Sequence, residues 1–96
     1  MVVERARVYL EFVGANVHRL RVKRGITQEM LEEASGLDSR FLRRVERGAV
    51  MMRLDTLIRL ADALGAEPAR LLKPSKPIVP KSGRPRQKTS TGRRGR

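Results

Sequence analysis

Residues 25–48 read GITQEMLEEASGLDSRFLRRVERG, and this stretch carries the same helix-start signal twice. Thr27 and Asp38 each precede an apolar-periodic run, and the side-chain oxygen of such a residue accepts a free backbone N–H at the start of a helix. Gly36 separates the two runs, and glycine is favoured just beyond the end of a helix. The stretch therefore predicts one short helix on each side of Gly36, the second running to about Arg47.

Three further helices are expected around this pair. The first ends near Arg24 and carries Val13, Val17 and Leu20 on one face, at the i, i+4 and i+7 spacing of an amphipathic helix. Residues 1–12 fit no single period. They form the first turns of that helix, a separate short helix or a frayed arm.

A fourth helix carries a wide apolar stripe that should face the core, formed by Leu54, Leu57, Ile58, Ala61 and Leu64. Gly65 ends this helix, and Pro68 suits the first position of a fifth, in which Leu71 and Leu72 close the core. Two short helices joined by a few residues that include glycine have the outline of a helix-turn-helix. The expected fold is therefore all-α, with five helices in one compact domain.

The charge is strongly basic and unevenly placed. The 96 residues include 22 Lys and Arg and 10 Asp and Glu, a net charge of +12, which predicts an acidic partner. Nine of the basic residues and none of the acidic ones lie in residues 73–96, which also hold four of the five prolines. This region offers too few apolar side chains to offset the entropy of ordering, so a disordered basic tail is predicted. It follows the domain at residues 13–72, with residues 1–12 in front.

Several classes of function are excluded by what the sequence lacks. No cysteine is present, which excludes a disulfide framework and thiolate metal sites, and no metal or cofactor is expected. No apolar run approaches bilayer length, so no membrane partner is expected, and the chain is assigned to the cytoplasm, at the nucleoid. An enzyme is not expected either, because no nucleophile or phosphate-binding loop accompanies the single histidine. That residue, His18, should be exposed to solvent.

From Val13 to Leu72 the chain resembles the Xre family of phage-repressor and Cro-type DNA-binding domains. The matching positions are Gly14, Asn16, Val17, Leu20, Arg21, Gly25, Thr27, Gln28, Glu29, Leu31, Gly36, Leu42, Val45, Glu46, Arg47, Gly48, Leu57, Leu60, Ala61, Leu64 and Gly65. The resemblance implies a sequence-specific transcriptional regulator that binds double-stranded DNA as a homodimer on an inverted repeat. It also implies a partly buried ion pair between Arg21 and Glu46, which ties the first helix to the third.

In this family the third helix, here about residues 38–47, enters the major groove. The residues that would then contact bases are Ser39, Arg40, Arg43 and Arg44. Arginine donates two parallel hydrogen bonds to O6 and N7 of guanine, which favours a G-containing half-site. The alternative is that these arginines only neutralise phosphates. Phe41 either fills the edge of the core or touches a thymine methyl.

Four residues are expected to contact backbone phosphates, namely Thr27, Gln28, Arg47 and Arg53. Two features depart from the family pattern. Glu32 stands where relatives usually have alanine near the crossing of the second and third helices, so its carboxylate must reach solvent or an arginine such as Arg43 or Arg44. Met51 and Met52 replace a polar, proline-containing lead-in to the fourth helix, and a looser loop is expected there.

The tail contains Ser-Gly-Arg-Pro-Arg at residues 82–86, which looks like the core of an AT-hook. Such a strand lies in a narrow minor groove, whose negative potential would attract Arg84 and Arg86. The alternative is a generic polycation that raises nonspecific affinity.

The sequence alone leaves two alternative functions and the residues of the dimer contact undecided. One alternative is an antitoxin-type interaction protein that binds a partner protein and regulates its own expression; the arginine-rich third helix argues against this as the sole role. The other is an RNA-binding or nucleoid-coating protein, which the scarcity of aromatic residues disfavours. A dimer would use the fifth helix or the segment around Val2, Val3 and Val8.

Overall fold

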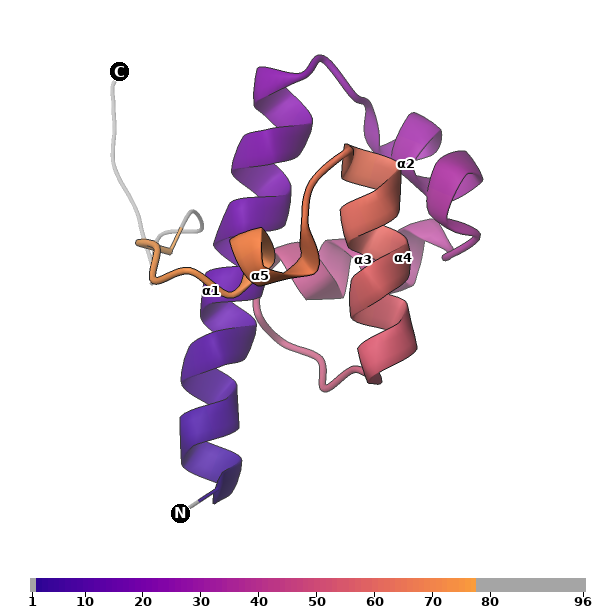
Figure 1. Ribbon diagram of the computed structural model, residues 1–96. Coiled ribbons are helices and arrows are strands. Elements are labelled where there is room, and N and C mark those ends of the chain that lie inside the picture. The colour runs from indigo at the N-terminus through magenta and orange to yellow at the C-terminus, as the bar shows by residue number, and fades with distance from the viewer. Residues whose placement is uncertain (1, 78–96) are drawn as a thin grey trace, which may run out of the picture.

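The computed structural model describes the backbone of residues 2–77 and the side chains of residues 3–77, and it consists of five α-helices (Figure 1). The helices are α1 at Val2–Lys23, α2 at Gln28–Ser35, α3 at Ser39–Glu46, α4 at Leu54–Leu64 and α5 at Pro68–Leu71. No strand is present over this range, which confirms the all-α prediction. None of these helices could cross a lipid bilayer.

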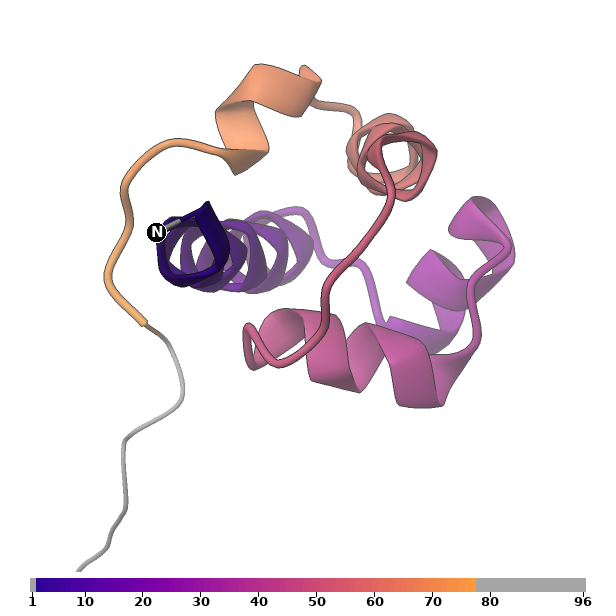
Figure 2. The ribbon, with the colours of Figure 1, turned by 90° about the horizontal axis from the view of Figure 1, so that it is seen from below.

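The other four helices form an arc around α1, whose N-terminal half extends beyond them (Figures 1 and 2). Of the three alternatives for residues 1–12, the structure has the first, since α1 continues from Val2 without a break. The buried apolar side chains that join the helices are Val13, Val17, Leu20, Leu31, Leu42, Val45, Leu57, Leu60, Ala61, Leu64 and Leu71. This single cluster holds α2 and α3 against α1 and α4.

The predicted core faces of α4 and α5 are wrong at three positions. Leu54 is 71% exposed, and Ile58 and Leu72 are 40% and 38% exposed. Leu60, which the stripe omitted, is fully buried. Helical spacing shows which residues share a face, but not how far the neighbouring helices cover that face. Leu54 opens α4 at the edge of the domain, beyond the cover of the other helices of residues 2–77.

The backbones of α1 and α3 approach each other most closely at Gly14. A Cβ atom added there would lie 2.4 Å from the carbonyl oxygen of Val45 and 2.9 Å from that of Glu46. Both obstacles are backbone atoms, which cannot move aside as the end of a flexible side chain can. Glycine therefore permits this crossing, which sets the position of the C-terminal end of α3.

A buried amide fixes the segment after α5 to α1. Asn16, which is 3% exposed, donates hydrogen bonds of 2.9 Å from its side-chain nitrogen to the carbonyl oxygens of both Leu71 and Lys73. Its side-chain oxygen accepts a hydrogen bond of 3.1 Å from Arg70. The Ser75 hydroxyl is also hydrogen-bonded to α1. These contacts extend the fixed structure past Leu72, where the sequence predicted that a disordered tail begins; residues 78–96 lie outside the described range.

Candidate nucleic-acid interface

Side-chain caps hold the N-termini of α2 and α3. The hydroxyl of Thr27 accepts a hydrogen bond of 3.0 Å from the backbone N–H of Met30, and the Asp38 carboxylate accepts one of 2.8 Å from that of Phe41. Gly36 ends α2 with a φ of 75°, in the left-handed region that favours glycine. Both predicted caps are confirmed, and together they fix where α3 begins.

α3 has one buried face and one face that carries arginines. The buried side chains are Leu42, Val45 and Glu46. The exposed side chains include three of the predicted base-contacting residues, Arg40, Arg43 and Arg44. Ser39, the fourth, is half-buried at the start of the helix. Phe41 is half-buried and packs against the core, which is the first of its two expected positions.

The charges on this face are available to an external anion. Within residues 2–77, no ion pair involves Arg40, Arg43 or Arg44, nor the exposed Arg47 that follows the helix. Glu32 is half-buried, and it too makes no ion pair over the described range. The departure from the family pattern in α2 therefore leaves the guanidinium groups of α3 unneutralised.

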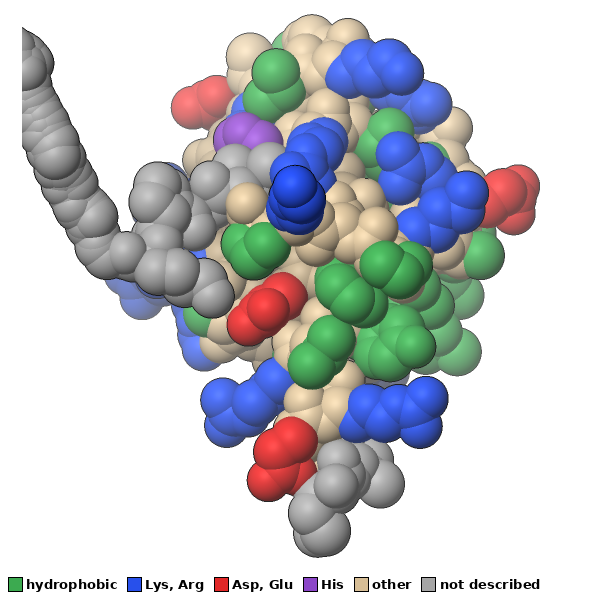
Figure 3. Space-filling view, turned by 90° about the vertical axis from the view of Figure 1, so that its left-hand side faces the viewer, with side chains coloured by type: hydrophobic (Ala, Val, Ile, Leu, Met, Phe, Trp, Pro, Cys, Tyr) green, Lys and Arg blue, Asp and Glu red, His purple; other side chains and the backbone are tan. Residues whose placement is uncertain are grey.

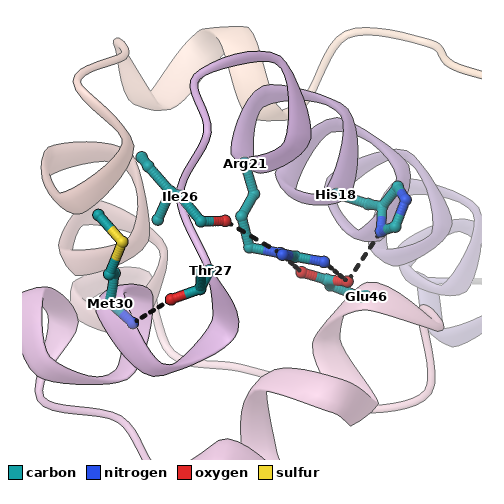
Figure 4. Close-up of polar contacts among 6 residues, drawn as sticks. All are labelled: His18, Arg21, Ile26, Thr27, Met30 and Glu46. Carbon is teal, nitrogen blue, oxygen red and sulfur yellow. Dashed lines mark hydrogen bonds and ion pairs between the residues drawn. The ribbon is translucent and has the colours of Figure 1, made fainter.

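An ion pair behind this face joins α3 to α1 (Figure 4). Arg21 donates from Nε to Oε2 of Glu46 at 2.6 Å and from Nη2 to Oε1 at 3.3 Å. Its Nη1 also donates to the carbonyl oxygen of Ile26 at 3.1 Å. Only 14% of the Arg21 side chain and 8% of the Glu46 side chain are exposed. The end of α3 is thus tied both to α1 and to the loop before α2.

His18 is a further partner of the same carboxylate. Its Nδ1 lies 3.0 Å from Oε1 of Glu46, and its side chain is 32% exposed. The prediction that His18 is simply exposed to solvent is therefore wrong. It lies three residues before Arg21 on α1, a spacing that places both side chains over one partner. Burial raises the pKa of the Glu46 carboxyl, but hydrogen bonds and electrostatic attraction from Arg21 and His18 outweigh it and hold that pKa below its ordinary value.

The helix pair and its support correspond to a known family. A family model described as helix-turn-helix, HTH_3, matches residues 17–71, which include α2, the turn at Gly36 and α3. The chain belongs to this helix-turn-helix family. The match confirms the resemblance to Xre-type domains. It begins in the last third of α1, so residues 2–16 of that helix lie outside it.

Individual helix-turn-helix proteins are similar over the same part of the chain. It is 40% identical over 65 residues to the HTH-type transcriptional regulator y4dJ of Sinorhizobium fredii, which covers 68% of this chain and 84% of that one. It is 39% identical to the restriction-modification controller protein C.AhdI from Aeromonas hydrophila, over 65% of this chain and 94% of that one, with a TM-score of 0.62. It is 33% identical to the clp gene regulator ClgR from C. glutamicum, over 67% of this chain and 83% of that one, with a TM-score of 0.63. The chain is a DNA-binding regulator of transcription.

The predicted phosphate contacts of this helix-turn-helix lie at two places around α3. Thr27 and Gln28 are at the N-terminus of α2, where free backbone N–H groups attract an anion. Arg47 and Arg53 lie at the ends of the loop that joins α3 to α4. Arg53 forms an exposed ion pair of 3.2 Å with Asp55 and gives α4 no side-chain cap, unlike the caps of α2 and α3.

Two polar residues that support the helix-turn-helix were not recognised as such from the sequence. Asn16 was matched to the family only by position, although a polar residue between Val13 and Val17 on an apolar face signals a buried hydrogen-bonding role. Arg24 donates hydrogen bonds to the carbonyl oxygens of Leu64 and Gly65 at the end of α4. No sequence signal links these residues, which lie about forty positions apart.

The lowered pKa of Glu46 predicts how stability depends on pH. A carboxyl whose folded-state pKa lies below its ordinary value of 4.5 contributes stability that is present above that value and is lost as the pH falls through the folded-state pKa. Glu46→Gln should therefore be less stable than the wild type near neutral pH, and the difference should shrink on acidification below pH 4.5. Urea unfolding of both proteins, from neutral pH to below pH 4.5, measures this difference in stability. A difference that is constant with pH would contradict the assignment.

Proposed function

We propose that this chain is a sequence-specific regulator that reads double-stranded DNA through α3 in the major groove. The proposed base-contacting residues are Ser39, Arg40, Arg43 and Arg44. The observation that carries the proposal is the exposed, unpaired row of guanidinium groups on a helix whose opposite face is fixed by the Arg21–Glu46 ion pair. Arginines held in this way can donate paired hydrogen bonds to guanine.

Residues around α3 position the protein on the DNA backbone. Thr27 and Gln28 bind one phosphate at the N-terminus of α2, while Arg47 and Arg53 bind others from the loop after α3. These contacts supply affinity and salt dependence but little sequence information. His18 has no catalytic role in this proposal, because its Nδ1 lies against Glu46.

The regulator acts as a homodimer on an inverted repeat, with half-sites about one helical turn apart. A recognition helix of eight residues spans few base pairs, so two copies are needed for a selective site. Two relatives are named as a controller protein and a gene regulator, which supports the same role here. The proposed place of action is the nucleoid.

Selection of binding sites from random duplex DNA at fixed salt tests the proposal. The wild type should select an inverted repeat, and Arg40→Ala with Arg43→Ala should lose the preference by about 10- to 100-fold at each contacted base pair. The matched control is Arg5→Ala with Lys23→Ala, which removes two exposed charges from α1 instead. The control should lower affinity without changing the selected sequence. An unchanged site in the α3 double variant would contradict base reading.

The same selection separates the two alternatives for the tail, whose Arg84 and Arg86 lie outside the described residues. If the tail is an AT-hook, Arg84→Ala with Arg86→Ala should remove an A/T preference in the flanks of the site. If it is a generic polycation, the variant should lose only salt-dependent affinity.

A further inference from the structure

The N-terminal half of α1 carries charges to which the proposed function gives no role. Residues 3–12 include two acidic and two basic side chains, Glu4, Glu11, Arg5 and Arg7, all of them exposed. Figure 3 shows charged side chains of both signs around the lower end of the molecule, where this half of α1 lies. Because the four charges cancel, the segment is not a general polycation. Any contact that it makes with an anion must come from the position of one side chain.

Arg7 lies on the face of α1 that packs against α3. Helical spacing places Arg7, Glu11 and Gly14 on one face, at i, i+4 and i+7. Gly14 touches the backbone at the C-terminal end of α3, and a Cβ atom added to Gly48 would lie 3.0 Å from Cα of Glu11. α1 therefore runs in close contact past the end of α3 and the start of the loop that follows it. Arg7 lies one turn further along the same face.

Arg7 consequently lies beside the loop that joins α3 to α4. Together with Leu10 and residues 48–51 it lines a pocket of about 150 Å³. Arg7 is the only one of these residues with a polar side chain, so the other polar atoms of the pocket belong to the backbone. The loop begins at Arg47, which is already a proposed phosphate contact and directly precedes the pocket residues in the sequence. Arg7 thus adds a second guanidinium group to this part of the surface.

The guanidinium group of Arg7 is available to an external anion. Within residues 2–77 Arg7 forms no ion pair and no side-chain hydrogen bond, although Glu11 lies one turn away on the same face. The backbone N–H groups of Val50 and Met51 donate no hydrogen bond over the same range. Arginine side chains and free backbone N–H groups are the donors that proteins use to bind DNA phosphates.

We propose that Arg7 binds a DNA phosphate near the one bound by Arg47, so that α1 extends the contact with the DNA backbone beyond the helix-turn-helix. The inference rests on the proposed function, because it adds to the DNA contacts of α3 and its loop. Arg7 lies outside residues 17–71, which match the family model, so the contact belongs to a part of α1 that the model does not include. It positions the protein and supplies affinity, but it reads no base.

The salt dependence of DNA binding tests this contact. Each phosphate contact that is lost lowers the slope of log affinity against log salt concentration by about 0.9. Arg7→Gln should therefore weaken binding of the full chain about five- to tenfold at about 0.1 M salt and leave the selected sequence unchanged. Fluorescence anisotropy over a series of salt concentrations measures the affinity and the slope. Glutamine is a good helix former, so unfolding curves should match the wild type.

The matched control is Arg5→Gln, which removes the same charge from the same exposed segment of α1. Arg5 is two residues from Arg7 and points about 200° away around the helix. Opposite faces of a helix lie about 10 Å apart, which is close to the distance over which salt at about 0.1 M screens a charge. Arg5→Gln should therefore weaken binding less than about twofold and lower the slope by less than about 0.3.

Glu11 supplies a test of the opposite sign. Its carboxylate forms no ion pair within the described residues and lies one turn from Arg7, so it repels a phosphate that Arg7 binds. Glu11→Gln should strengthen DNA binding about two- to threefold. The gain should shrink in the double variant Arg7→Gln with Glu11→Gln, because the phosphate is no longer held beside position 11.

Uncharged methylphosphonate groups, placed one at a time in the selected site, locate the contact. At one position outside the bases read by α3, the substitution should weaken binding of the wild type and of Arg5→Gln. The same substitution should have little effect on Arg7→Gln, which has already lost its partner for that phosphate.

The inference is overturned if Arg7→Gln and Arg5→Gln lose the same affinity, since net charge alone would then explain both. It is equally overturned if Glu11→Gln brings no gain, or if no methylphosphonate position distinguishes Arg7→Gln from the wild type. Failure of the proposed function looks different. The wild type would then select no sequence from random DNA, whereas Arg7→Gln would still bind an arbitrary duplex with a smaller salt slope than Arg5→Gln.

Discussion

Arg21→Ala should lower the free energy of unfolding by about 3 to 5 kcal/mol, because it leaves the buried Glu46 carboxylate without its main partner. It also removes the hydrogen bond to the carbonyl oxygen of Ile26. His18 stays beside Glu46, so the lower part of this range is expected. Urea unfolding followed by circular dichroism at neutral pH measures the loss. Such a loss would be a large fraction of the total stability of a domain of this size.

A double-mutant cycle shows whether the loss belongs to the ion pair. Arg21→Ala and Glu46→Gln, made singly and together, should give a coupling free energy of at least about 1 kcal/mol. Coupling near zero would mean that the two side chains act independently. Arg21→Lys serves as the milder control, because lysine keeps the charge but not the forked geometry that reaches both carboxylate oxygens. The free energy of unfolding of Arg21→Lys should lie between those of the wild type and Arg21→Ala.

Gly14→Ala should destabilise the fold by about 2 to 3 kcal/mol, although alanine is the better helix former by about 1 kcal/mol in an open helix. The substitution is expected to destabilise the fold instead of stabilising it, because the new Cβ would lie 2.4 Å from the carbonyl oxygen of Val45. α1 and α3 must move apart to admit it, which also displaces the arginines of α3. Unfolding curves should show the lost stability, and binding to the selected DNA site should weaken with it.

The control for Gly14→Ala is a substitution to alanine at an exposed position of the same helix, α1. Val22→Ala, at a position that is 58% exposed, should change the stability by less than about 0.5 kcal/mol. A stability of Gly14→Ala equal to or above that of the wild type would show that the two helices are not held in contact at this point.

Local signals in the sequence were enough to predict the helix pair and the exposed arginines. The caps at Thr27 and Asp38 and the break at Gly36 depend only on neighbouring residues, and the spacing of Arg40 and Arg43 against Leu42 follows from helical periodicity alone. These features could be read one segment at a time.

What the sequence could not supply is the arrangement of segments that are distant along the chain. The close approach at Gly14 depends on where α1 crosses α3, and the contact of His18 depends on the same crossing. The exposure of Leu54 depends on how far the other helices reach along α4. None of these is determined by spacing within one helix. The Arg21–Glu46 pairing was reached through the family resemblance, which carries such long-range information.

The hydrogen bonds that join Lys73 and Ser75 to α1 fix the point on the domain from which the later residues of the chain start. Arg84 lies nine positions after Ser75, and a fully extended chain over nine positions spans about 30 Å. This distance is slightly less than one helical turn of DNA. If Arg84 contacts a DNA groove, that contact must therefore lie within about one helical turn of Ser75. A substitution of Asn16 that breaks its hydrogen bond to Lys73 would move this starting point as well as destabilise the domain.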